Sequence, residues 1–190
     1  MAFLRSLKID DPTMFLRNTV DEEGRLEHLF WSDGRSQLDY SLFGDVLAFD
    51  ATYKKNKYLS PLVVFSGVNH HNQTVVFATA IVANEVEDTY VWLLDQFVEV
   101  MKGKMPKSVI TDGDLAMRKA IGRIFPDAHH RLCAWHLTRN ATSNVKNTRF
   151  KTLFQKCMLC DYEIDQFERR WNEMVKECGV EDNVWVSELY

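Results

Sequence analysis

The sequence predicts an α/β domain in which helices pack on a mixed sheet of five strands. Three short apolar runs come first, and tight polar turns join them. Two further apolar runs follow, each preceded by a helix-like pattern. Tight turns connect antiparallel strands and helical crossovers connect parallel ones, so this order of elements implies a mixed sheet. With 190 residues, 46% of them hydrophobic, the chain is long enough to bury one domain core.

Residues 1–43 form a lead-in segment with a mixed pattern. Residues 25–31 alternate between polar and apolar side chains, which predicts a strand, and the turn-forming pair Asp33 and Gly34 ends it. Residues 36–43 are predicted to form a short helix. Its expected apolar face consists of Leu38, Leu42 and Phe43.

The five strands of the predicted sheet are short and rich in β-branched and aromatic residues. They are residues 45–49, 59–68, 74–82, 108–111 and 130–133. Polar connections at residues 54–57 and 69–73 join the first three, which makes these strands antiparallel.

The predicted helices of the second half follow capping residues and apolar positions at helical spacing. Asp88 caps the helix before the fourth strand, and Asp114 caps the helix before the fifth. Another helix begins at Ala134, and a last one is capped by Asp161. The expected apolar face of the last helix consists of Ile164, Phe167, Trp171 and Met174 or Val175.

Two aspartates close two of the strands. Asp50 follows the first strand and Asp112 follows the fourth. In the predicted order the fourth strand lies beside the first and parallel to it, which is the ribonuclease H-like arrangement. The two carboxylates then meet at the carboxyl edge of the sheet, where open α/β sheets place their sites. Either aspartate alone is typical of a cap on the next turn, but a pair on a rigid sheet can hold a divalent metal ion for phosphoryl transfer.

The charge balance argues against a freestanding DNA-binding domain. The formal net charge is −4 and the sequence pI is about 5.9, whereas domains that grip a phosphate backbone over a broad face are basic. One basic stretch runs from His129 to Lys151, and such a stretch is typical of a solvated helix face. No apolar run approaches the roughly 20 residues of a membrane span, so we expect no membrane partner.

Four short sequence motifs lie along the chain at or near the ends of the predicted strands. They are Gly44-Asp-Val-Leu-Ala-Phe-Asp-Ala-Thr-Tyr53, Gly67-Val-Asn-His-His-Asn-Gln73, Ile110-Thr-Asp-Gly-Asp114 and His130-Arg-Leu-Cys-Ala-Trp-His136. Together they resemble the Mutator-like (MULE) transposase domain, and most closely its plant branch of transposase-derived transcription factors, the FAR-RED IMPAIRED RESPONSE and FAR-RED ELONGATED HYPOCOTYL family. The resemblance covers nearly the whole chain. It implies a lead-in segment at 1–43, a ribonuclease H-like MULE core at 44–150 and the start of a helical insertion at 151–190.

The resemblance implies roles for four residues. Asp50 and Asp112 match the first and second catalytic aspartates of the family, and both could hold Mg²⁺. In active relatives the third acid is a glutamate after a long helical insertion, and no residue of this chain is assigned that role; Asp114 fits a helix cap better. Cys133 and His136 match the family's CxxH signature. They either supply two of the four ligands that a structural zinc ion needs or form a buried thiol beside a hydrogen-bonded imidazole.

Two functions compete. The first is a domesticated, catalytically inactive domain of a nuclear transcriptional regulator of the light-response type. The alternative is a DDE-type transposase core that uses Mg²⁺ held by Asp50 and Asp112 to cleave and transfer DNA strands. The missing third acid and the acidic charge balance both favour the first function. A ribonuclease H-type nuclease would need a further acid at a strand position, and none is evident.

The first function carries expectations about partners and cofactors. The zinc-binding DNA-recognition domain and the SWIM zinc finger of the family do not occur in this sequence, so we expect a fragment or a truncated gene product that reaches DNA indirectly. We expect no cofactor except Mg²⁺ if the chain is catalytic. We also expect a homodimer, or a heterodimer with a related protein, that uses an exposed face formed by Phe167 and Trp171.

Overall fold

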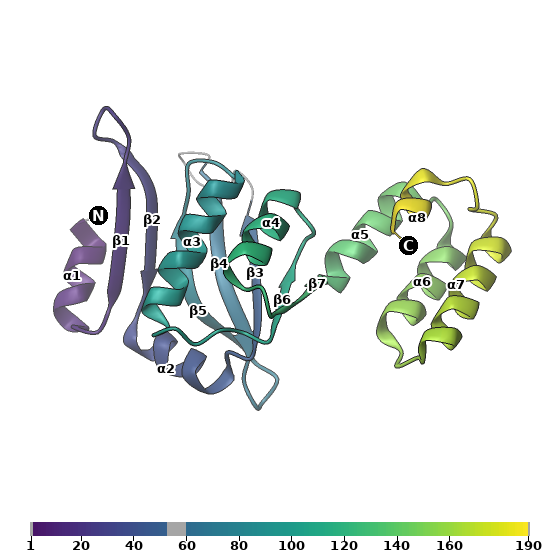
Figure 1. Cartoon of the computed structure of the whole chain (residues 1–190), viewed down its shortest axis with the longest axis horizontal. Coiled ribbons are helices and arrows are strands. Elements are labelled where there is room, and N and C mark those ends of the chain that lie inside the picture. The colour runs from purple at the N-terminus through teal and green to yellow at the C-terminus, as the bar shows by residue number, and fades with distance from the viewer. Residues whose placement is uncertain (1, 53–59, 190) are drawn as a thin grey trace. The chain divides into compact units, whose positions relative to one another are not determined.

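The computed structural model describes residues 2–52 and 60–189, which form two compact units (Figure 1). The first unit spans positions 1–131 and the second spans 132–190. The elements of the first unit are α1 (Ala2–Asp10), β1 (Phe15–Val20), β2 (Leu26–Ser32), α2 (Gly34–Phe43), β3 (Val46–Thr52), β4 (Leu62–Val68), β5 (Thr74–Ile81), α3 (Glu87–Val100), β6 (Ser108–Thr111), α4 (Leu115–Ile124) and β7 (His129–Leu132). The turn predicted at 54–57 lies outside the described residues.

The sheet is mixed, and its order is β1-β2-β5-β4-β3-β6-β7. The five predicted strands correspond to β5, β4, β3, β6 and β7, which are contiguous in this order and give the ribonuclease H-like topology. β3 pairs with β6 in parallel and with β4 antiparallel, as the connections require. The fold class is therefore confirmed.

The predicted number of strands is wrong, because the lead-in segment adds two. β1 and β2 form an antiparallel hairpin, and β2 extends the sheet at the β5 edge through the pair Leu29 and Ile81. The hairpin turn is held by the Asp21 carboxylate, which accepts hydrogen bonds from the backbone N–H of Glu23 and Arg25 at 3.1 and 2.8 Å. The lead-in segment thus contributes two strands to the sheet.

The core of the first unit lies between one face of the sheet and the helices α2, α3 and α4 (Figure 1). Val63 and Phe65 of β4 and Leu47 and Phe49 of β3 alternate inward and are fully buried. On β3 and β4 the opposite face carries side chains that are only half-buried or exposed. This alternation fixes which strand residues face the helices and which point away from them.

The predicted apolar face of α2 is wrong. Leu38 and Leu42 are 55% and 63% exposed, and the buried residue of the helix is Tyr40. The Tyr40 ring lies edge-on against Phe77 and Phe97, and its hydroxyl donates to the Lys104 carbonyl at 3.2 Å. One aromatic side chain with a bonded hydroxyl therefore determines the rotation of this short helix.

Helix α3 begins earlier than predicted. Its N-cap is Val86 rather than Asp88, and Glu87 and Asp88 occupy its first turn, where carboxylates are favourable. Asp114 caps α4 as expected, since its carboxylate accepts from the Met117 N–H at 2.9 Å. None of the helices in the described part of the chain is long and apolar enough to cross a membrane.

The second unit is helical and has its own core. Its helices are α5 (Ala134–Asn144), α6 (Thr148–Leu159), α7 (Ile164–Cys178) and α8 (Val184–Leu189). The face of α7 that was expected to be exposed is instead part of this core: Trp171 is 7% exposed and packs against Phe154 with ring centroids 6.1 Å apart. The predicted face fails also at Ile164, which is exposed, because the helix starts after Glu163 and not at Asp161.

Candidate functional site

The parallel pairing of β3 with β6 places the two candidate aspartates side by side. The register aligns Val46 with Ser108 and Ala48 with Ile110. Continued by two residues, the same register aligns Asp50 with Asp112, and neighbouring strands lie about 4.8 Å apart.

Asp50 lies on the sheet face that α2, α3 and α4 leave uncovered. Leu47 and Phe49 alternate toward the helices, so Asp50 points to the other side and is exposed. Asp112 is half-buried, and it follows Thr111, which is buried. The two strands are thus parallel neighbours as predicted, with Asp50 within β3 and Asp112 directly after β6, while the chemical roles of the two aspartates stay a prediction.

The backbone beyond β6 is fixed by a short turn. One carboxylate oxygen of Asp112 accepts from the Asp114 N–H at 3.0 Å, and Gly113 between them has a φ of 96°, which favours glycine. The Asp114 carboxylate in turn caps α4. Part of the bonding capacity of these two acids is thus used to start the helix.

The Thr111 side chain also makes contacts that hold this turn. Its hydroxyl lies 2.8 Å from Nε2 of His130 on β7, and it also accepts from the Gly113 N–H at 3.3 Å. Burial, together with the positive charge of Arg118, lowers the pKa of His130. The contact between Thr111 and His130 therefore joins β7 to the end of β6.

Glu85 is a fourth acid near the pair, and the sequence analysis did not single it out. It lies in the loop after β5 and accepts a hydrogen bond from the Tyr90 hydroxyl at 3.4 Å. Burial raises the pKa of Glu85, and the negative charges of Asp114, Asp112 and Asp50 raise it further, while the Tyr90 bond opposes the shift. Four carboxylates thus share one electrostatic environment.

Glu85 could have been identified as a candidate from the directions of the strands. β5 is antiparallel to β4, and β4 is antiparallel to β3, so β5 runs in the same direction as β3. The carboxyl end of β5 therefore lies at the same edge of the sheet as Asp50. An acid three to four residues beyond that strand end was a candidate on the same argument that selected Asp112.

The chemistry that this group of acids can perform is limited by how they are bonded. Carboxylate oxygens are the ligands that Mg²⁺ prefers. Within residues 2–52 and 60–189, however, no three His, Cys, Asp or Glu side chains are arranged to hold a metal ion. Asp50 and Asp112 could supply two ligands, whereas Asp114 caps a helix and Glu85 is bonded to Tyr90.

Cys133 and His136 lie at the start of α5, in the second unit. Cys133 is the N-cap residue, is half-buried and makes no side-chain capping bond. His136 is half-buried, its Nδ1 atom is buried, and its ring lies edge-on to Trp135 at 4.7 Å. No third ligand for zinc joins them among the described residues. Zinc binding by these two residues stays a prediction.

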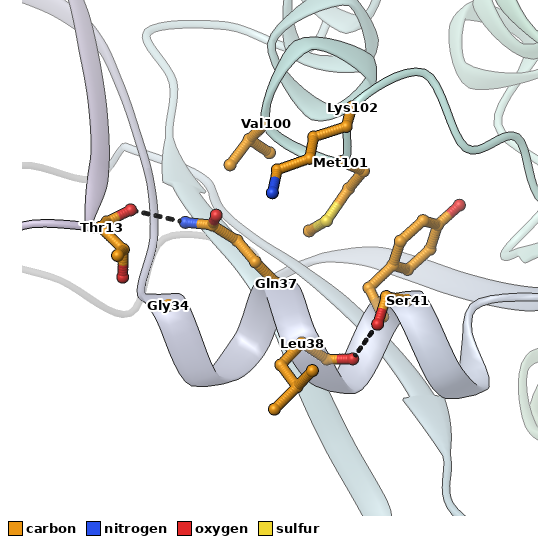
Figure 2. A pocket seen from close by; sticks show the side chains of 9 residues that line it. Thr13, Gly34, Gln37, Leu38, Ser41, Val100, Met101 and Lys102 are labelled. Carbon is orange, nitrogen blue, oxygen red and sulfur yellow. Dashed lines mark hydrogen bonds between the residues drawn. The ribbon is translucent and has the colours of Figure 1, made fainter.

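A cavity beside the core of the first unit lies away from the acids. It has a volume of about 260 Å³ and lies between α2 and the C-terminal end of α3 (Figure 2). Figure 2 shows the Lys102 ammonium group reaching across it and the Gln37 amide bonded to the Thr13 carbonyl. Glu85 precedes the other end of α3, a helix of 14 residues and hence about 21 Å long. This cavity is therefore not part of the acidic site.

The order of the sheet and the parallel pairing of β3 with β6 define a ribonuclease H-like α/β domain. The model of the MULE transposase domain matches residues 46–140, which is half of the chain. The chain therefore belongs to the MULE transposase domain family.

Curated relatives match over the full length of the chain. It is 33% identical to Protein FAR1-RELATED SEQUENCE 5 and 34% identical to Protein FAR-RED IMPAIRED RESPONSE 1, both of Arabidopsis thaliana, in each case with 100% of this chain covered. Those alignments cover 25% and 24% of the two relatives, so the chain spans about a quarter of their length.

A solved structure with some similarity is the HTLV-2 integrase catalytic core domain in complex with magnesium. It is 15% identical, and the match covers 68% of this chain and 81% of that one with a TM-score of 0.34.

Proposed function

We propose that the chain is a transposase-derived domain of a nuclear transcriptional regulator of the light-response type, and that it has no strand-transfer activity. The observation that carries the proposal is the match to FAR-RED IMPAIRED RESPONSE 1 and its FAR1-related counterparts over the whole chain. The name of that relative refers to a response to far-red light. A regulatory role in the nucleus would belong to the longer protein of which such a domain is one part.

The bonding of the acids supports the absence of catalysis. An in-line displacement with two metal ions needs carboxylates that bridge both ions and a further ligand for the second. Asp50 lies on β3 and Asp112 directly follows β6, the parallel neighbour of β3, so these two carboxylates would take the bridging position. The other two nearby acids each use one carboxylate oxygen in a hydrogen bond, Asp114 at the α4 cap and Glu85 with the Tyr90 hydroxyl, and neither is arranged with Asp50 and Asp112 as a third metal ligand.

The alternative is a DDE-type transposase core that cleaves and transfers DNA strands with Mg²⁺. The alignment of Asp50 with Asp112 on adjacent parallel strands is the observation that favours it. In that case the two carboxylates would hold the ion, and the ion would activate water and then a 3′-hydroxyl group.

A cleavage assay separates the two functions. We expect no Mg²⁺- or Mn²⁺-dependent cleavage of labelled duplex DNA by the purified chain, and no difference between the wild-type protein and Asp50→Asn. In parallel, a reporter gene to which the chain is tethered by a fused DNA-binding domain should respond equally to both proteins. Cleavage that disappears in Asp50→Asn, or a reporter response that depends on Asp50, would favour the alternative.

We also propose that the domain reaches DNA through separate modules and associates with a second copy or a related chain. Soluble assemblies are most often symmetric homo-oligomers, which supports the dimer. Because Trp171 is buried, the contact surface must lie elsewhere than on the Phe167 and Trp171 face. Sedimentation of the purified chain over a range of concentrations tests this proposal, and a strictly monomeric protein would contradict it.

A further inference from the structure

The face of α5 that points away from the core of the second unit carries an exposed aromatic ring beside a cation. Trp135 is 62% exposed, although Trp is a residue that proteins usually bury for most of its surface. The guanidinium carbon of Arg139, one helical turn further on, lies 5.5 Å from the centroid of the Trp135 ring. The opposite face of α5 is anchored by buried Ala141 and, just past the helix, buried Val145.

The surroundings of Trp135 are cationic and polar. Residues 132–160 contain no aspartate or glutamate, in a chain whose net charge is −4. Their basic residues are Arg139, Lys146, Arg149, Lys151 and Lys156. Arg149 is paired with Glu177 of α7, but none of the other four forms an ion pair with a described residue. The second unit therefore concentrates uncompensated positive charge on α5 and α6.

These features fit a nucleic acid better than a protein partner. Protein-binding hot spots lie in well-packed apolar surroundings, whereas the exposed α5 positions that follow Trp135 are Arg139, Asn140, Thr142, Ser143 and Asn144. A polyanion with flat bases satisfies both the positive charge and the exposed ring. In a duplex the bases already stack on one another, so the ring can accept only an unpaired base or the base at a strand end.

We propose that Trp135 and Arg139 form a stacking site for an unpaired base of a nucleic-acid strand, with Lys146, Lys151 and Lys156 contacting phosphates. The site is independent of sequence, because every base has a π-face and phosphates carry no sequence information. It holds whether or not the domain regulates transcription, and it involves neither Asp50 nor Asp112. It is also compatible with a domain that cannot select a DNA sequence on its own.

The test is binding of the purified chain to a labelled thymidine oligonucleotide and to a blunt duplex of the same length, measured by fluorescence anisotropy at low and physiological salt. We expect tighter binding to the single strand. Trp135→Ala should weaken that binding on the order of 5- to 100-fold, the range for the loss of one base–aromatic stack, while Trp135→Phe retains most of it. Arg139→Gln should weaken single-strand and duplex binding alike and reduce the salt dependence.

Two matched controls come from the same unit. Leu159→Ala removes an exposed apolar side chain of α6, and Lys176→Gln removes an exposed cation of α7. Both should bind like the wild-type protein. The proposal is overturned if the chain does not bind the single strand at low salt, if it binds single strand and duplex equally well, or if Trp135→Ala leaves binding unchanged. Loss of self-association in Trp135→Ala without loss of DNA binding would instead identify a protein contact and would equally overturn the proposal.

Discussion

Removing the charge of Glu85 should stabilise the first unit, because Glu85 shares its environment with three aspartates. The substitution Glu85→Gln deletes one negative charge and keeps an oxygen that can accept from Tyr90. Two unit charges about 8 Å apart in water repel by roughly 0.5 kcal/mol, and screening at physiological salt leaves about a third of that. Summed over Asp50, Asp112 and Asp114, the expected gain is about 0.5 kcal/mol, a discounted value suited to partly exposed groups.

The pH dependence of this gain has a definite sign. The pKa of Glu85 is raised above its ordinary value of 4.5 in the folded protein. The wild-type protein therefore loses stability as the pH rises from 4.5 through the raised pKa, since folding disfavours the charged form. The advantage of Glu85→Gln should be present at neutral pH and should vanish below pH 4.5, where Glu85 is protonated in both the folded and the unfolded state.

Thermal unfolding at several pH values and salt concentrations provides the measurement. At neutral pH and physiological salt we expect Tm to rise by about 2 °C, and by more at low salt. Glu87→Gln is the matched control: it removes the same charge two residues away, but Glu87 pairs with Lys119 at 3.7 Å, so its loss should be neutral or slightly destabilising. If Glu85→Gln does not raise Tm, or if its effect is equally large at acid pH, the four carboxylates do not repel one another as described.

Three further predictions test other parts of the structure. Phe154→Ala should lower the free energy of unfolding by ~3–5 kcal/mol, because the ring is fully buried in the core of the second unit. Leu159→Ala, on the exposed side of the same helix, should change it by less than about 0.5 kcal/mol. Urea unfolding of both variants measures the difference. Lys102→Gly should stabilise by about 0.5–1 kcal/mol, since Lys102 has a φ of 54° at the end of α3 where glycine is unstrained, and an unchanged or lower Tm would contradict that account. Thr111→Val should cost about 1–3 kcal/mol because it removes the partner of His130 at a buried position, and amide exchange at β7 should speed up accordingly; protection that stays at the wild-type level would show that this bond does not hold β7.

The strands of the central sheet could be predicted because their side chains alternate between a buried and an exposed face and turns separate them. The same reasoning missed β1, since Phe15–Val20 is a half-exposed edge strand whose apolar residues are diluted by Arg17 and Asn18. It also chose the wrong face for α2, where one tyrosine outweighs two leucines. Tertiary packing determines whether an edge strand forms and which face of a short helix is buried. The spacing of apolar residues along the sequence carries no information about that packing.

The residues of the candidate site were likewise predictable only in part. Asp50 and Asp112 were predictable because strand order and direction alone bring the ends of β3 and β6 together. Glu85 was not identified because it lies in a loop, several residues past the end of β5, and its approach to the aspartates depends on how that loop folds. Asn84 holds the loop by accepting from the Thr89 hydroxyl at 2.6 Å, a contact with no periodic signature in the sequence.

The turn after β6 affects what can be concluded from the acids at positions 50 and 112 when the sequences of relatives are compared. The Asp112 carboxylate bonds to the backbone that starts α4, so natural selection for folding can preserve an aspartate at this position after catalysis has been lost. Asp50 lies within a strand, where aspartate is depleted because it does not favour extended structure. Across relatives, replacement of the acid at position 50 is therefore the more sensitive record of lost catalysis, whereas an acid retained at position 112 is consistent with either history.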